Sequence, residues 1–223
     1  MKVSIIIPAY NEEKRLPQTL KRIKEFLRGE NWESEIIIVD DGSEDRTTQV
    51  AIKEGIKVIK NSSNQGKGYS VKRGVEVAEG DYIFFTDADL STPIEEIDGF
   101  LAWLEKEYDI VIGSRTHPEA KILRHQAKYR ENMGKFFNLL VRMLFQIPFR
   151  DTQCGFKGFK KKVAKRLFRE LSCRGFAFDV ELIVKALKAG YRIKEIGVTW
   201  INSPDSRVKL TSSPLSMLWE LFK

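Results

Sequence analysis

Short apolar runs that alternate with helical patterns constrain the fold of this 223-residue chain more than any other feature. The runs have strand length and little polar interruption, as parallel strands buried on both faces do. They are residues 3–7, 35–39, 57–59, 82–86 and 110–112. Helical patterns separate them: one covers about 16–27, and another begins at the capping box Thr92-Pro93-Ile94-Glu95. The alternation predicts an α/β fold with a doubly wound, mostly parallel sheet.

The second half of the chain is less regular. Helices are expected at about 129–145 and 180–189, a strand at 192–200, and a short amphipathic helix in the tail, 214–223. A glycine-punctuated stretch, 154–159, separates the first two of these helices. No repeat, low-complexity tract or linker divides the chain, so we expect one domain with an irregular C-terminal half.

Composition and charge indicate a folded soluble protein with a local basic patch. The hydrophobic content of 42% and charged content of 31% are typical of a folded soluble protein. Neither a signal peptide nor a membrane-spanning helix is expected, and the two cysteines, Cys154 and Cys173, favour a reducing cytosol over a disulfide framework. Within the net charge of +7, residues 115–150 carry eight basic and two acidic side chains. Such a basic patch attracts nucleic acid, anionic lipid or a phosphorylated substrate.

Polar clusters follow the predicted strands, where ligands of an open parallel sheet bind. They are residues 8–12, 40–43, 64–68, 87–89 and 113–115. Together they predict a nucleotide pocket in which Tyr10 stacks on a base, Asp40 accepts a base N–H and Glu12 holds a ribose hydroxyl. For Asp40 and Asp41, a cap on the following helix is the alternative. Because the patterns GxxxxGK[ST] and GxGxxG are both missing, a P-loop NTPase and a nicotinamide-binding domain are disfavoured.

Asp87-Ala88-Asp89 places two carboxylates directly behind the buried run 82–86. Hard oxygen ligands in this arrangement suit Mg²⁺ or Mn²⁺ that also holds a diphosphate. A surface turn or a helix cap is the alternative interpretation.

Seven motifs, in this order, together resemble family 2 glycosyltransferases of the GT-A fold. They are P-x-Y-N-E at 8–12, V-D-D-G-S at 39–43, N-x-G-K-G at 64–68, D-A-D-L-S at 87–91, G-S-R at 113–115, D-T-Q-C-G-F-K at 151–157 and F-D-V-E-L at 178–182. Within the family, the last two are most similar to dolichyl-phosphate β-glucosyltransferases, and D-A-D-L-S to dolichyl-phosphate mannose synthases. The resemblance implies a Rossmann-like GT-A domain over 1–223, with a nucleotide-sugar half, 1–115, and an acceptor and membrane-facing half, 116–223.

The resemblance also implies roles for single residues. The nucleotide sugar would be held by Pro8, Tyr10, Glu12, Asp40, Asp41, Lys67, Asp87, Arg207 and Lys209, the last two closing over the diphosphate. Asp87 and Asp89 would bind Mg²⁺ or Mn²⁺ with help from Ser91, and Arg115 and Arg130 would receive the acceptor phosphate. Asp89, Arg115, Arg130 and Asp179 form the expected catalytic set. Asn132, Met133 and Gly134 depart from the mannose synthases, which have a small hydroxyl side chain shortly after the position of Arg130.

The implied reaction is an inverting transfer of a hexose from a nucleotide sugar, with UDP-glucose favoured, to dolichyl or polyprenyl phosphate. GDP-mannose or UDP-N-acetylglucosamine remain alternative donors. Extension of a glycan is an alternative reaction, in which Asp179 or Asp151 would accept the hydroxyl proton. For Asp179 a helix cap before Val180 is the other interpretation.

The lipid acceptor implies a peripheral position at the cytoplasmic face of a membrane. The expected helix at 132–145 is apolar with basic interruptions, so it suits lying in the interface, although packing against the core is the alternative. The same two interpretations hold for Leu215, Leu218, Trp219, Leu221 and Phe222 in the tail. Nucleic acid is excluded as a partner, because the aspartates expected along the pocket rim would repel its phosphates.

Overall fold

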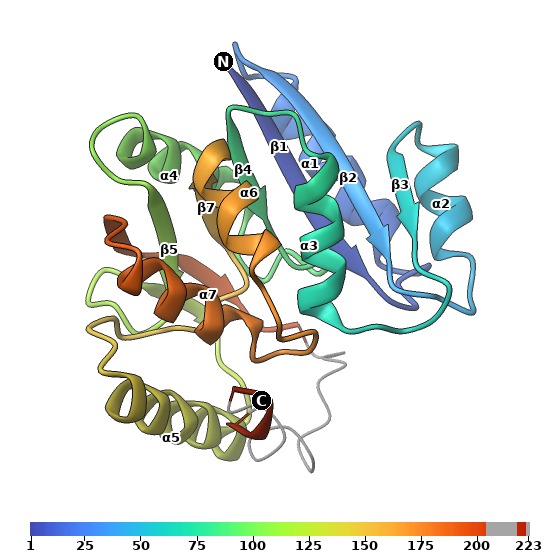
Figure 1. Ribbon diagram of the computed structural model, residues 1–223. Helices are drawn as coiled ribbons and strands as arrows, with labels where there is room; N and C mark the ends of the chain where they lie inside the picture. Colours follow the sequence, from blue (N-terminus) through green and yellow to red (C-terminus); the bar gives the residue numbers. More distant parts are fainter. Residues whose placement is uncertain (204–217, 222–223) are drawn as a thin grey trace.

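The computed structural model describes residues 1–203 and 218–221, without the side chain of Arg130. A seven-stranded sheet with the order β3-β2-β1-β4-β7-β5-β8 forms its centre (Figure 1). Only β7 runs antiparallel to its neighbours; the other paired strands of the sheet are parallel. The strands are β1 (Lys2–Ala9), β2 (Glu33–Asp40), β3 (Lys57–Lys60), β4 (Tyr82–Phe85), β5 (Ile110–Ser114), β7 (Lys157–Lys160) and β8 (Ile193–Gly197).

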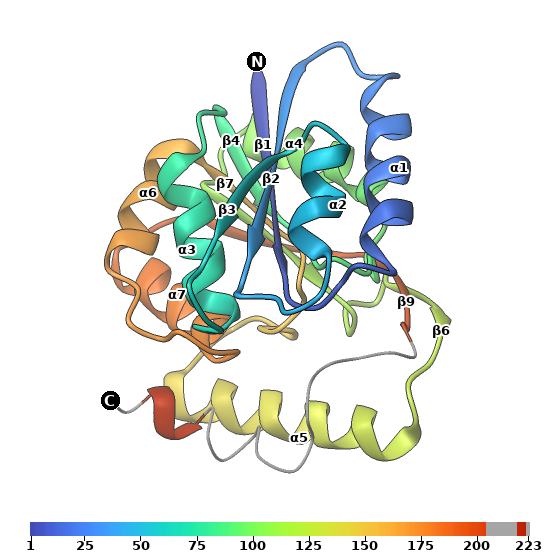
Figure 2. The same cartoon turned by 90° about the vertical axis from the view of Figure 1, so that its right-hand side faces the viewer.

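Helices cover both faces of this sheet (Figures 1 and 2). One face carries α1 (Leu16–Leu27), α2 (Thr47–Lys53), the short 3₁₀ helix η1 (Ile94–Glu96) and α4 (Ile97–Leu104). The other carries α3 (Lys67–Val77), α6 (Lys161–Arg169) and α7 (Phe178–Lys188). Successive strand residues point to opposite faces, so Ile5 and Ile7 pack in the first layer and Ile6 in the second. The predicted doubly wound, mostly parallel α/β fold is confirmed.

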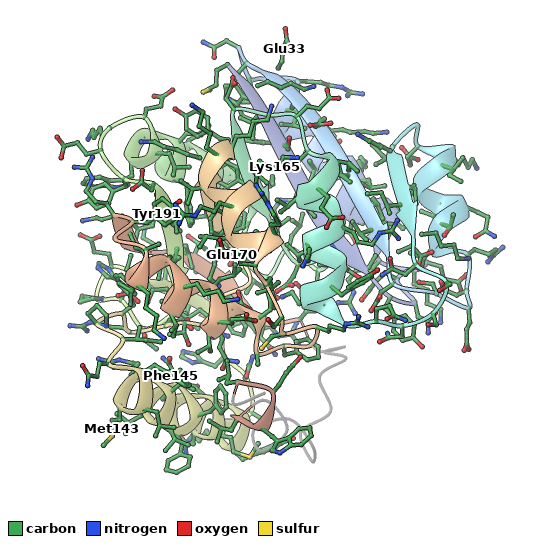
Figure 3. The ribbon with its side chains drawn as sticks, in the orientation of Figure 1. Glu33, Met143, Phe145, Lys165, Glu170 and Tyr191 are labelled. Carbon is green, nitrogen blue, oxygen red and sulfur yellow. The ribbon has the colours of Figure 1, made fainter. Side chains whose placement is uncertain are left out.

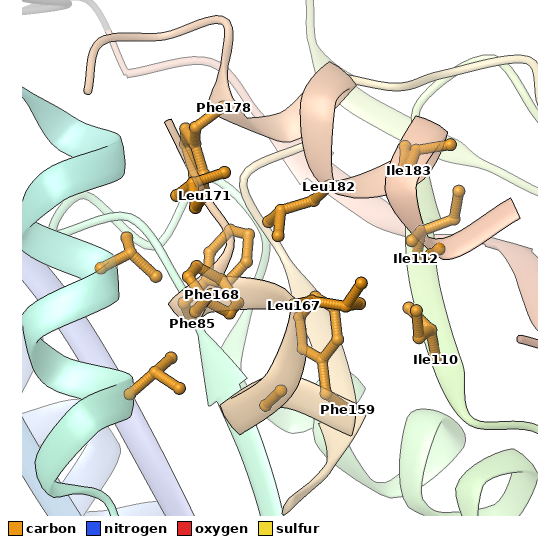
Figure 4. Close-up of a cluster of buried hydrophobic side chains, with 14 of the residues drawn as sticks. Phe85, Ile110, Ile112, Phe159, Leu167, Phe168, Leu171, Phe178, Leu182 and Ile183 are labelled. Carbon is orange, nitrogen blue, oxygen red and sulfur yellow. The ribbon is translucent and has the colours of Figure 1, made fainter. Parts of the chain in front are cut away.

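A cluster of aromatic rings joins β4, β7, α6 and α7 on the second face (Figure 4). The centroid of the Phe85 ring lies 6.0 Å from that of Phe159, 6.3 Å from that of Phe168 and 5.5 Å from that of Phe178. These four rings are almost completely buried. Aromatic pairs at such separations add to the free energy of area burial, so the cluster fixes the end of β4 against the start of α7.

Several features differ from the sequence prediction, which contained neither α6 nor a strand at 121–124. The glycine-punctuated stretch contains β7, where a Cβ on Gly158 would lie 2.4 Å from the Phe84 ring, so only glycine lets β7 approach β4. The expected strand at 192–200 is two strands, because β9 (Thr199–Ile201) leaves the main sheet and pairs with β6 (Lys121–Arg124). The capping box is also wrong: η1 precedes α4, and no side chain caps either helix.

Helix α5 (Lys128–Phe145) lies beyond the carboxyl ends of the strands, separate from the two covering layers (Figures 1 and 2). Phe137 and Val141 on one side are buried in the core of the second face. Leu218 and Leu221, in a helical turn of the tail, also pack partly buried there. Large apolar side chains on the other side of α5 are exposed. Packing against the core is therefore confirmed for one face of this helix, and a position in the membrane interface stays a prediction for the other. In the described residues, no helix has the length and hydrophobicity that crossing a bilayer requires.

Candidate functional site

A pocket of about 420 Å³ opens where the carboxyl ends of the strands meet. Strand order reverses between β1 and β4, and such a switch point leaves a crevice between the loops of neighbouring strands. The pocket brings together most of the residues singled out from the sequence. They are Pro8, Tyr10, Glu12, Asp41, Lys67, Asp87, Asp89, Ser91, Arg115 and Asp179.

Four predicted residues are not placed in this lining. Asp40 is fully buried, and its carboxylate accepts hydrogen bonds from the backbone N–H of Ser43 and the hydroxyl of Thr48. Its role in base binding stays a prediction. Arg207 and Lys209 lie outside the described residues, and so does the side chain of Arg130. Their roles also stay predictions.

Asp41 connects two of the loops around the pocket. One of its carboxylate oxygens accepts hydrogen bonds from the Asn61 side chain at 2.7 Å and the Gln65 backbone at 2.9 Å, and the other from the Gly66 backbone at 2.9 Å. The N-cap of α2 is Arg46, so the interpretation of Asp41 as a cap on this helix is wrong. Asp41 instead fixes the glycine turn that leads into Lys67.

The carboxylates of Asp87 and Asp89 each face a cation. Lys67 Nζ lies 2.5 Å from Asp87 Oδ1, and Arg15 Nη1 lies 3.6 Å from Asp89 Oδ2. Asp89 also accepts a hydrogen bond from the backbone N–H of Ser91 at 2.9 Å, which is a turn contact and not a helix cap. Burial, and then the negative charge of Asp87, raises the pKa of Asp89. The two carboxylates therefore form a concentrated negative site that favours cations.

The residues of this site fit a divalent metal ion. Gly155 leaves space directly against Asp87, since a Cβ there would lie 1.9 Å from Asp87 Oδ2. In the described part of the chain, no three acidic, histidine or cysteine side chains form a metal cluster. Asp87, Asp89 and the hydroxyl of Ser91 line the pocket and stay the predicted donors. Mg²⁺ is usually bound in this way, by one or two carboxylates together with substrate phosphates and water.

A buried lysine that the sequence analysis missed holds Asp179. Lys157 is 0% exposed, and its Nζ donates to Asp179 Oδ1 and to the carbonyl of Cys154, both at 2.6 Å. Burial raises the pKa of Asp179, and the positive charges of Lys157 and Lys67 oppose this shift. The N-cap of α7 is Ala177, so the interpretation of Asp179 as a helix cap is wrong. The motif D-T-Q-C-G-F-K contained the signal for Lys157, because a lysine inside a buried stretch needs an anionic partner.

Arg115 is held by Asp151 through a two-pronged ion pair. Arg115 Nε donates to Asp151 Oδ2 at 2.7 Å, Nη2 donates to Oδ1 at 2.9 Å, and the Arg115 backbone N–H adds a third bond. Asp151 is 2% exposed. Burial alone would raise its pKa, but the Arg115 guanidinium holds the pKa of Asp151 at about 2. The guanidinium also lies 5.9 Å from the Trp200 ring, so its direction into the pocket is fixed.

Comparison with known proteins decides the family. The sequence profile of glycosyl transferase family 2 matches residues 4–168. This chain belongs to that family. The predicted membership is confirmed.

Curated relatives support a narrower group. Dolichyl-phosphate beta-glucosyltransferase of Drosophila melanogaster is 34% identical over 240 residues, covering 100% of this chain and 74% of the relative. The human protein of the same name is 34% identical over 224 residues, covering 92% of this chain and 69% of its own.

Solved structures confirm the GT-A fold. Glucosyl-3-phosphoglycerate synthase of Mycobacterium tuberculosis, solved with Mn²⁺, UDP and phosphoglyceric acid, superposes with a TM-score of 0.75 at 18% identity. The superposition covers 99% of this chain and 77% of the synthase.

Proposed function

We propose that this family 2 glycosyltransferase moves glucose from UDP-glucose to dolichyl or a related polyprenyl phosphate, with inversion and with Mg²⁺ or Mn²⁺. One observation carries the proposal: Asp87, Asp89, Lys67 and Arg115 line a single pocket at the switch point of the sheet. The names of the curated relatives support the acceptor and the sugar. UDP and Mn²⁺ in the structural neighbour support the donor and the metal.

The donor diphosphate gains negative charge as the bond to the anomeric carbon breaks. A divalent ion held by Asp87, Asp89 and Ser91 would supply charge stabilisation to the diphosphate oxygens. Lys67, from the first turn of α3, lies beside the same carboxylates and adds a second positive charge. Arg207 and Lys209 are proposed to contribute further positive charge when the donor is bound.

The acceptor phosphate needs positioning more than deprotonation. A phosphate monoester has its second pKa at about 6, so the attacking oxygen is already anionic near neutral pH. Arg115, fixed by Asp151, would bind this phosphate with its remaining N–H groups, and Arg130 is proposed as a second contact. Asp179, paired with Lys157 at the pocket wall, is poised to accept a hydrogen bond from a sugar hydroxyl.

The outer face of α5 supports a peripheral position on a membrane. Its exposed apolar side chains recur at helical spacing and form a stripe: Tyr129, Met133, Phe136, Leu139 and Met143. Met143 projects from the side of the helix turned away from the sheet (Figure 3). Met133 of this stripe, together with Gly134 and Phe137 of α5, lines the pocket, so a helix lying in the interface would bring the pocket to the lipid phosphate. Cys154 and Cys173 are unpaired, which supports the cytoplasmic face.

A glucosyl-transfer assay tests the chemistry. Purified protein is mixed with Mn²⁺, a short polyprenyl phosphate in detergent, and in turn UDP-glucose, GDP-mannose or UDP-N-acetylglucosamine. We expect a glycolipid and release of nucleoside diphosphate with UDP-glucose alone. Preferred transfer to a free sugar or glycan would contradict the proposal and favour glycan extension.

Vesicle flotation tests the membrane surface. Phe136→Ser with Met143→Ser should reduce binding to vesicles about tenfold, because two inserted apolar side chains are lost. Ile52→Ser is the matched control, since Ile52 on α2 is equally exposed but lies far from α5. Equal binding by the double variant and the control would contradict this orientation.

A further inference from the structure

A second groove lies against α5, separate from the pocket that holds the aspartates. Its volume is about 410 Å³, and it is lined by Thr116, Lys135, Asn138, Leu139, Arg142 and Arg150. None of these residues lines the first pocket. The lining carries three cationic side chains and no carboxylate, so its chemistry is that of an anion site.

The cations differ in how far they are already neutralised. Lys135 Nζ lies 2.6 Å from Glu131 Oε1 one turn earlier in α5, so this lysine has an intrahelical partner. Within the described residues, neither Arg142 nor Arg150 forms an ion pair. Arg142 Nε is also buried without a hydrogen-bond partner, which costs free energy unless a ligand accepts from it. The two arginines are thus available to an anion.

The wall of the groove is rigid around these arginines. Asn138 donates to the Arg150 carbonyl and accepts from the Thr152 hydroxyl at 3.1 Å. Glu195 on β8 accepts from the backbone N–H groups of Arg150 and Asp151 at 2.8 and 2.9 Å. Helix α5 and the segment that carries Arg150 are therefore tied together, and the groove between them is preformed.

Position on the helix indicates the source of the anion. Lys135, Asn138, Leu139 and Arg142 follow i, i+3, i+4, i+7 spacing, so they share one edge of α5. This edge lies between the buried face, with Phe137, and the exposed apolar stripe defined above, to which Leu139 also belongs. A helix that inserts its stripe into a bilayer brings such an edge to the level of the headgroups.

We infer that this groove binds the phosphate of an anionic membrane phospholipid, beside and separate from the acceptor site. The inference rests on the proposed membrane position of α5 but not on the sugar, the donor or the metal. Arg142 and Arg150 would grip the phosphate oxygens with their guanidinium forks, and the Thr116 hydroxyl would donate to the same group. The headgroup would thereby set the orientation of α5 on the surface.

The test is binding to phosphatidylcholine vesicles with and without phosphatidylglycerol. Arg142→Gln with Arg150→Gln should lower affinity for the anionic vesicles about 30-fold, since each basic residue at such a surface contributes about 1 kcal/mol. Lys162→Gln with Arg169→Gln is the control of equal charge, on α6 away from α5. The control should lose less than about twofold, because charges farther from the surface than a Debye length are screened.

A conservative variant distinguishes a specific phosphate-binding site from general electrostatic attraction to the anionic surface. Arg142→Lys with Arg150→Lys keeps the charge and removes the forks, so affinity should still fall about fivefold. Three results would each overturn the inference. The lysine variant could bind with wild-type affinity, the glutamine variant and its control could lose affinity equally, or phosphatidylglycerol could leave binding of the wild type unchanged. Inorganic phosphate should not displace the vesicles at millimolar concentration, and full displacement would assign the groove to a free phosphate instead.

Two measurements keep the outcomes separate. Melting temperatures of all variants show whether they fold. If the glutamine double variant does not fold, Arg150→Gln alone replaces it in the binding test, because the Arg150 side chain is exposed. Wild-type glucosyl transfer in detergent is measured independently. Its absence would contradict the proposed function and leave the vesicle result standing.

Discussion

Two ion pairs face the same pocket, and they differ in how firmly they are held. Lys67 and Asp87 meet through one contact, and the Asp87 side chain is 40% exposed. Arg115 and Asp151 meet through three hydrogen bonds, with Asp151 2% exposed. In the proposed reaction both partners of the first pair acquire other partners, the metal and the diphosphate, whereas the second pair stays closed. On this proposal, the Lys67–Asp87 pair on the donor side would rearrange during the reaction, and the Arg115–Asp151 pair on the acceptor side would stay rigid.

The largest expected effect is loss of a carboxylate on the donor side. Asp89→Asn should lower the rate of transfer about 10³-fold, because the diphosphate loses the charge stabilisation that the metal site supplies. The melting temperature without ligands should change little, since the contacts of Asp89 are a local turn with Ser91 and an ion pair with Arg15 at 3.6 Å. Turnover is measured by release of UDP, and near-normal turnover would contradict the metal site.

The second-largest effect is expected from loss of the Asp151 carboxylate on the proposed acceptor side. Asp151→Asn should lower kcat/KM for the polyprenyl phosphate about 10²-fold, because Arg115 loses the group that orients it. The KM for UDP-glucose should stay close to the wild-type value. A matched change, Glu119→Gln, removes an exposed carboxylate from the same half of the chain and should have no effect. Equal changes for donor and acceptor would mean that Asp151 acts on the fold as a whole.

The rigid pair also predicts how stability depends on pH. The folded-state pKa of Asp151 is about 2, below the value of about 3.9 in an unfolded chain, so the folded state binds fewer protons there. Its contribution of about 2.5 kcal/mol is complete above about pH 5 and is lost as the pH falls through about 2. Urea unfolding should show that the free-energy difference between the wild type and Asp151→Asn shrinks across this window. A difference that stays constant from pH 7 to pH 2 would rule out this ion pair as its source.

The smallest effect is expected at the less firmly held pair, Lys67 and Asp87. Its sign should differ between UDP and Mn²⁺. Lys67→Met should weaken binding of UDP about tenfold, because a charged hydrogen-bond donor to the diphosphate is lost. The same change should let Mn²⁺ alone bind a few-fold tighter, because Asp87 no longer has a competing cation. Calorimetric titration of each ligand measures both. Weaker binding of Mn²⁺ would mean that Lys67 supports the metal site.

The part of the molecule that sequence predicted well is the part with local signals. Residues of β1, β2 and β4 carry continuous apolar runs, and the polar loops behind them converge because parallel strands end at one edge. The partners of the side chains proposed as catalytic were not predictable in this way. Arg115 and Asp151 are 36 residues apart, and Lys157 and Asp179 are 22 apart, so each pair forms through the fold and not through a local pattern. Strand β7 was missed because its sequence, Lys-Gly-Phe-Lys, has no strand periodicity.

A crystal structure with Mn²⁺ and UDP tests the contrast between the two pairs most directly. We predict anomalous density for Mn²⁺ between Asp87 and Asp89, the Lys67 ammonium moved from Asp87 to the diphosphate, and the Arg115–Asp151 pair unchanged. A cation bound elsewhere, or a Lys67–Asp87 pair that persists while the Arg115–Asp151 pair opens, would contradict the account.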